Sequence, residues 1–136
     1  MTIRSDALEL FGSMISAIQA RIDLKAVILF GSRVKGTAHA YSDYDLVIVG
    51  DFKEEYFTRL EWIVQLAPFV SVDLFCYTPQ EFEAMFKEFR LTPIDAVGEG
   101  VVLFGDEWVR PYKNRHDALL EQGMRKTDCV LIPPSV

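Results

Sequence analysis

Two short apolar segments and the turn between them restrict the possible folds of this chain. Residues 26–30 are apolar without a break, and Gly31-Ser32 ends the run. After ten further residues, Asp43-Tyr44-Asp45 opens a second apolar run that extends to residue 49. Apolar runs of this length, bounded by turn residues, are typical of buried β-strands. We therefore expect two strands with polar groups where the turn joins them.

A third apolar run, residues 70–77, contains one acidic residue, Asp73. Side chains two positions apart on a strand point to the same face, so Asp43 and Asp45 share a face. In the third run the even-numbered residues are apolar, which leaves Asp73 on the opposite, acidic side. Two carboxylates about 5 Å apart repel by roughly 3 kcal/mol at an effective dielectric constant near 20. A fold that gathers three of them usually does so to hold divalent cations.

Hydrophobic periodicity predicts further elements. Helices are expected over residues 5–22, 56–67, 79–89, 92–98 and 116–124, a fourth strand over residues 101–104, and a loop over residues 33–42. Thr78 and Glu81 are spaced as a capping box for the third helix. This order is not a regular βαβ alternation. It predicts an α/β fold in the loose sense (α+β), with a mixed sheet of about four strands and helices packed on one face.

Size and charge narrow the class of protein. The chain has 136 residues, half of them apolar, which suits one domain. We assign residues 1–110 to that domain and residues 111–136 to a tail, helical in part, that packs on the domain or on a partner. The net charge of −6 argues against binding a long nucleic-acid template. No run is long enough to span a bilayer and the N-terminus is not a signal peptide, so a cytoplasmic protein is expected.

The acidic cluster and the Gly-Ser turn suit phosphate chemistry. Three carboxylates can hold two Mg²⁺ ions about 3.5–4 Å apart, the arrangement that clamps both oxygens of a phosphoryl displacement. Gly31 lets the backbone approach a phosphate closely, and the Ser32 hydroxyl can bond to its oxygens. Arg33 and Lys35 follow directly and can neutralise a triphosphate. An alternative stays open, in which Arg33 and Lys35 belong to an ordinary solvated loop and bind no phosphate.

The spacing of these residues resembles a known signature. Gly31-Ser32, the ten-residue gap and Asp43-Tyr44-Asp45 resemble the Gly-Ser…Asp-hydrophobic-Asp pattern of the DNA polymerase beta-type nucleotidyltransferase superfamily. The surrounding residues, FGSRVKGTAHAYSDYDLVIV, are similar to the minimal nucleotidyltransferases of prokaryotes. The resemblance covers residues 26–105. The departures are Tyr44, in place of the more usual aliphatic residue, and Lys35, where arginine is common.

The resemblance implies roles for these residues. Asp43 and Asp45 would hold both metals, and Asp73 would bind the catalytic metal and help to activate the acceptor hydroxyl. Gly31 and Ser32 would form the phosphate-binding pair. The implied cofactor is Mg²⁺, with two ions, and the implied substrate is ATP or another nucleoside triphosphate.

The resemblance also implies a partner. Minimal nucleotidyltransferases are often antitoxins paired with HEPN-domain toxins, and they can transfer a nucleoside monophosphate, usually AMP, to a tyrosine of the toxin. Two alternatives stay open: a non-catalytic antitoxin that neutralises its partner by contact, and a transferase acting on a small molecule or an RNA end. Self-association is also open, because the fourth predicted strand is uncapped.

Overall fold

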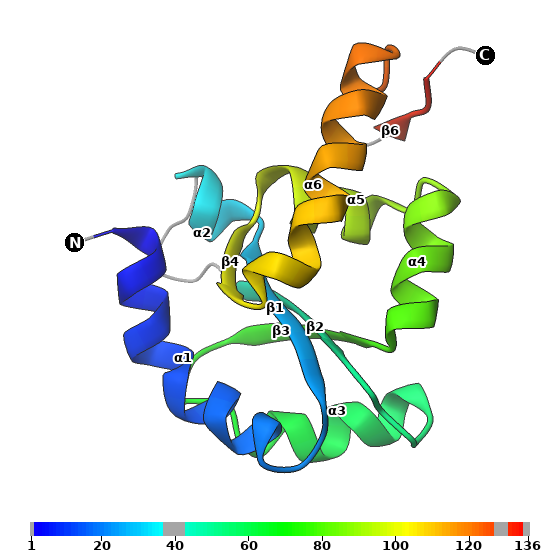
Figure 1. The fold of residues 1–136 in the computed structure, drawn as a ribbon. Coiled ribbons are helices and arrows are strands. Elements are labelled where there is room, and N and C mark those ends of the chain that lie inside the picture. Colours follow the sequence, from blue (N-terminus) through cyan, green and yellow to red (C-terminus); the bar gives the residue numbers. More distant parts are fainter. Residues whose placement is uncertain (1, 37–42, 127–130, 135–136) are drawn as a thin grey trace.

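The computed structural model describes residues 2–36, 43–126 and 131–134 of the chain. Its elements are α1 (Ile3–Gln19), β1 (Leu24–Phe30), α2 (Ser32–Lys35), β2 (Tyr44–Gly50), α3 (Tyr56–Val64), β3 (Val72–Tyr77), α4 (Pro79–Lys87), α5 (Leu91–Glu99), β4 (Val101–Phe104), α6 (Asp106–Glu121), β5 (Arg125–Lys126) and β6 (Leu131–Ile132). Figure 1 shows a central sheet with α1 and α3 on one side and α4, α5 and α6 on the other.

Four of the strands form one mixed sheet in the order β3-β2-β1-β4. β1 is antiparallel to both of its neighbours, whereas β2 and β3 run parallel. A parallel pair needs a crossover connection, and α3 supplies it. The antiparallel pair β1 and β2 needs none, and residues 31–43, which include the short α2, connect them. The predicted α+β fold with a mixed four-stranded sheet is confirmed.

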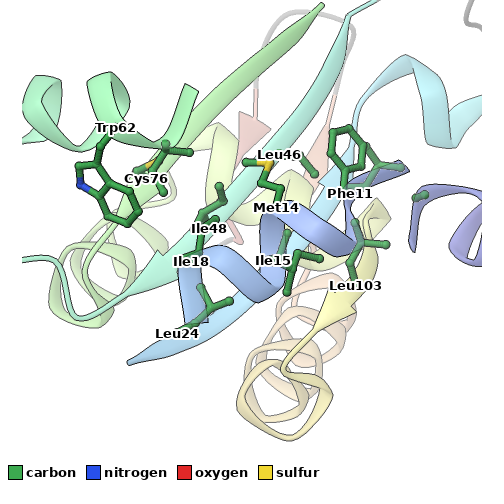
Figure 2. Close-up of a cluster of buried hydrophobic side chains, with 14 of the residues drawn as sticks. Phe11, Met14, Ile15, Ile18, Leu24, Leu46, Ile48, Trp62, Cys76 and Leu103 are labelled. Atoms are coloured by element: carbon green, nitrogen blue, oxygen red, sulfur yellow. The ribbon is translucent and has the colours of Figure 1, made fainter. Parts of the chain in front are cut away.

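One face of the sheet is covered by α1 and α3. Figure 2 shows Phe11 and Ile18 of α1 beside Leu46 and Ile48 of β2, with Trp62 of α3 in the same cluster. Phe11, Ile18, Leu46 and Ile48 have no exposed surface. Burying one such side chain contributes roughly 1.5–3 kcal/mol, so this face fixes where β2 lies and which of its residues point away.

The other face is also covered, by α4, α5 and α6. Its core contains Ile28 of β1, Val47 of β2, Phe82 and Phe86 of α4, and Tyr112 of α6. The prediction that the helices pack on one face is therefore wrong. The physical reason is the unbroken apolar run of β1: its alternate side chains enter opposite cores, and a strand apolar on both sides must be covered on both.

Two segments differ locally from the expectation. The predicted loop begins with a turn of helix, α2, and its residues 37–42 lie outside the described residues. The helix predicted over residues 116–124 is the second half of α6, which runs through Pro111. Asp106 and Glu107 in the first turn favour this helix, because they complement the positive end of its dipole. The domain boundary expected at residue 110 lies within α6.

A buried arginine joins β3 to the helices around it. The Arg59 side chain of α3 is 7% exposed and pairs with Glu81 of α4 at 2.6 Å. It also donates to the backbone oxygens of Cys76 (3.2 Å) and Glu54 (2.9 Å). Thr78 and Glu81 form the predicted capping box of α4. None of the helices in the described residues combines the length and apolar character needed to cross a bilayer.

Candidate active site

The parallel register of β2 and β3 sets two aspartates side by side. Asp45 of β2 is the direct partner of Asp73 of β3, and Phe30 of β1 is the partner of Asp45 on its other side. The faces agree with the expected parity. Phe75, two residues beyond Asp73, packs against Phe30 with ring centroids 5.8 Å apart, on the face covered by α4 and α6. Asp45 and Asp73 therefore point to the face covered by α4 and α6, near the first residues of β2 and β3.

Asp43 joins these two groups from the residue just before β2. Its carboxylate accepts a hydrogen bond from the Ser71 hydroxyl, and its charge acts on Asp45. Ser71 was not singled out from the sequence, although it lies two residues before Asp73 and so has the same strand parity. The backbone oxygen of Ser71 also accepts from the amide of Tyr44 at 2.9 Å, which fixes the start of both strands together.

The two neighbouring carboxyl groups affect the pKa of Asp45, the central one of the three. The pKa of Asp45 is raised to about 6, most by burial and then by the nearby charges of Asp73 and Asp43. A hydrogen bond with Asp73 also favours the protonated form. A carboxyl group with a raised pKa beside two others is typical of a functional site, and a bound cation would favour its ionised form.

Gly31 is fitted against this cluster. Its φ of 82° lies in the region that glycine adopts readily and other residues do not. A Cβ atom built on Gly31 would overlap the Asp45 carboxylate, so only a residue without a side chain allows the backbone this close. Ser32 follows as the first residue of α2 and is half-buried. The backbone of the Gly-Ser turn therefore lies directly against the Asp45 carboxylate.

The two cations after the turn are not directed at the carboxylates. The Arg33 guanidinium lies over the Tyr44 ring, 4.4 Å from its centroid, and Tyr44 in turn packs edge-on against Phe11 of α1. Arg33 also lines a small cavity of about 180 Å³ together with residues of α1. In this structure its side chain lies on the α1 side of the sheet, whereas Asp45 faces the other side.

Lys35 is held by an acidic residue outside the expected site. Its ammonium pairs with Glu99 at the end of α5, at 2.9 Å. Lys126 of β5 pairs with the same carboxylate at 3.5 Å and with Asp95 at 2.7 Å. The C-terminal segment is thereby tied to the helix that follows the Gly-Ser turn. No pattern in the sequence indicates this link, because its members lie up to 91 positions apart (126 − 35).

The donor set fits Mg²⁺ by its chemistry, because hard cations prefer carboxylate oxygens. Within the described ranges, no three ligating side chains stand in a finished metal-binding arrangement. The carboxyl groups are instead paired, Asp45 with Asp73 and Asp43 with Ser71. Binding a cation would replace these contacts, and its positive charge would favour the ionised form of Asp45.

A family described as "Nucleotidyltransferase domain" matches residues 13–121, which include α1 from its middle, the whole sheet and α6. Among curated proteins no match was found.

Solved structures show the same fold at low identity. A structure of a toxin-antitoxin with AMP-PNP has a TM-score of 0.57 and 20% identity, covering 81% of this chain and 86% of that one. A nucleotidyltransferase from Sulfolobus solfataricus has a TM-score of 0.54 and 20% identity, covering 77% and 86%.

A third structure is a variant of the toxin-antitoxin MntA-HpeT in which two aspartates, two positions apart, are replaced by glutamate. It has a TM-score of 0.56 and 16% identity, covering 81% and 85%. At these identities the similarity establishes the fold, whereas the family match spans most of the chain. The chain belongs to the nucleotidyltransferase domain family.

Proposed function

We propose that this chain is a Mg²⁺-dependent nucleotidyltransferase that moves a nucleoside monophosphate, AMP, from ATP to a hydroxyl group of a partner protein. The acceptor oxygen attacks the α-phosphorus, the bond to the β-phosphate oxygen breaks, and pyrophosphate leaves. The observation that supports this most is the side-by-side register of Asp45 and Asp73 against the glycine of the Gly-Ser turn.

Each residue of the site has a role in this proposal. Asp43 and Asp45 hold two Mg²⁺ ions, and Asp73 binds one of them and receives the proton of the acceptor hydroxyl. The metals supply the positive charge that stabilises the attacking and leaving oxygens. Gly31 and Ser32 bind the phosphates through the backbone and the hydroxyl. Arg33 and Lys35 neutralise the triphosphate, for which Lys35 must exchange Glu99 for a phosphate oxygen.

We further propose that the partner is a HEPN-domain toxin and that this chain acts as its antitoxin. The support is the kinship with structures described as toxin-antitoxin complexes, one of them with AMP-PNP. The MntA-HpeT variant has two aspartates replaced at the spacing of Asp43 and Asp45. The acidic net charge of this chain also suits a protein acceptor better than a nucleic acid.

The test uses the chain, Mg²⁺, ATP labelled at the α-phosphate and the co-expressed HEPN-domain protein. We expect label on that protein, and a loss of at least about a hundredfold in rate in the Asp43→Asn/Asp45→Asn double variant. Asp51→Asn is the matched control, because Asp51 follows the same strand at its far end and pairs with Lys53 in solvent. Transfer by the double variant at the wild-type rate would contradict the proposal.

A growth assay separates catalysis from neutralisation by contact. The same double variant is expected to bind the toxin but to leave it toxic. A variant that cannot transfer label yet still suppresses toxicity would show that the chain acts by binding alone. Competition by GTP, CTP and UTP in the labelling assay measures the base preference.

A further inference from the structure

An exposed apolar groove lies between α3 and the edge strand β3, next to the carboxylate cluster. It has a volume of about 500 Å³. Phe57, Leu60 and Val64 of α3 form one wall, at the spacing of a single helix face, and Val72 and Leu74 of β3 form the other. Apart from Asp73, the nucleotidyltransfer chemistry described above makes no use of the residues that line this groove.

The apolar exposure around this groove is unusually concentrated. Phe57 is 71% exposed and Val64 is 54% exposed. The exposed surface continues into the connection between α3 and β3, where Phe69 is fully exposed and Val70 partly so. Single exposed apolar residues are ordinary, but a contiguous group beside a groove marks an interaction site.

The way a partner can bind here is restricted by the edge of the sheet. The outward backbone oxygen of Leu74 already accepts a hydrogen bond from the Tyr56 hydroxyl (3.4 Å), and that of Cys76 accepts one from Arg59 (3.2 Å). A partner that extended the sheet here would have to displace or share these contacts, which disfavours adding a strand. Docking by side chains that enter the groove is therefore favoured.

The charges of the groove select the partner. Glu61 of α3 and Asp73 of β3 are its charged lining residues, and both are acidic. A two-fold contact between copies of this chain would bring the same patch against itself, so Glu61 and Asp73 would face like charges. An apolar surface flanked by lysine or arginine is complementary to it.

We propose that this groove docks the acceptor protein, by an apolar ridge that carries basic residues at its sides. The inference rests on the proposed function and adds the place and chemistry of the partner contact. Asp73 connects the two, because it lines the groove and is also the register partner of Asp45. A protein seated in the groove lies at the edge of the strand that carries Asp73, the residue proposed to receive the proton of its hydroxyl.

The test measures binding and transfer separately. The variants are Phe57→Ser/Val64→Ser and the charge reversal Glu61→Lys; all three side chains lie on the exposed side of α3. Leu120→Ser and Glu121→Lys on the exposed part of α6 are the matched controls. The measured quantities are the Kd for the HEPN-domain protein, the KM for it in the labelling assay, and the Kd for Mg-ATP.

We expect both groove variants to raise the Kd and the KM for the acceptor about tenfold or more. The kcat at saturating acceptor and the affinity for Mg-ATP should stay at the wild-type level, as in both controls. Acceptor binding unchanged in the groove variants would overturn the inference. So would a wild-type dimer, seen by analytical ultracentrifugation, that Phe57→Ser/Val64→Ser converts to a monomer, because a second copy would then fill the groove.

The result also separates this inference from the proposed function. If the wild type binds the acceptor through the groove but transfers no label, the catalytic proposal fails and the docking site stands. If label is transferred equally well by the groove variants and the wild type, the catalytic proposal stands and the docking site fails.

Discussion

Asp45 and Asp73 occupy paired positions on two parallel strands, and their carboxyl groups share a hydrogen bond. A carboxyl pair of this kind cannot ionise fully without a cost, because burial and the neighbouring charges oppose the second negative charge. The pKa of Asp45 is raised to about 6 because of that cost. The consequences can be measured in the chain alone, before any partner is known.

Removing the charge of Asp45 is expected to stabilise the chain without metal. Between about pH 4 and pH 6, the folded chain holds a proton on Asp45 that the unfolded chain has released. Stability therefore falls as the pH rises through this window, and Asp45→Asn escapes the loss. We expect a higher Tm for Asp45→Asn than for wild type at pH 7.5 in EDTA, and equal values near pH 4. A lower Tm at pH 7.5 would contradict this.

Mg²⁺ should bind in competition with this proton. Because the cation needs the ionised carboxylates, its affinity is expected to fall about tenfold per pH unit below about pH 6. Mg²⁺ at a hundred times its Kd should raise the free energy of unfolding by about 2.7 kcal/mol at neutral pH. Isothermal titration and thermal unfolding across pH 5–8 measure both quantities. Stabilisation by Mg²⁺ that persists unchanged in Asp43→Asn/Asp45→Asn would place the ion elsewhere.

The two glycines at the ends of α2 allow backbone strain to be distinguished from contact with the site. Gly31 and Gly36 have similar positive φ values, 82° and 77°. An added Cβ would overlap the Asp45 carboxylate at Gly31, and would meet nothing within 4 Å at Gly36. We expect either alanine variant to lose about 1–2 kcal/mol of stability. Only Gly31→Ala should also lose Mg²⁺ binding by titration; equal metal affinity in both variants would argue against the proposed contact.

Arg59 is expected to be the most sensitive charged residue of the scaffold. Arg59→Met leaves the Cys76 and Glu54 backbone oxygens without their donor and Glu81 without its partner. We expect a loss of about 3 kcal/mol in urea unfolding. Arg90→Met is the control, since Arg90 and Glu88 are both mostly exposed and such pairs contribute less than about 1 kcal/mol. Similar losses in the two variants would show that the buried contacts matter little.

The sequence predicted the central strands well because their signals are local. The apolar runs, the Gly-Ser turn and the capping box at Thr78 each act over a few residues, and the structure contains all three. Strand parity also gave the faces of Asp45 and Asp73, because alternation is a property of any strand. Which strand lies beside β2 is a tertiary fact that strand parity alone does not give.

The errors came from interactions between distant residues. The helices were expected on one face because the order of the elements is not a regular βαβ alternation. Periodicity shows that a helix has an apolar side but not which face of the sheet that side meets. The contact of Lys35 with Glu99 and Lys126 joins three separate segments, and composition gives no sign of it. The helix expected over residues 116–124 is part of α6, which begins at Asp106 and continues through Pro111.

Tyr44 and Asp45 are adjacent in the chain and face opposite sides of the sheet, one toward α1 and the other toward the carboxylate cluster. A shift of β2 by a single residue would place Asp45 in the hydrophobic core beneath α1 and would move the Tyr44 ring out of that core. The hydrophobic effect, which drives folding, thus also disfavours the shifted register of β2. Burial of the apolar face of β2 therefore also fixes the face on which Asp45 lies.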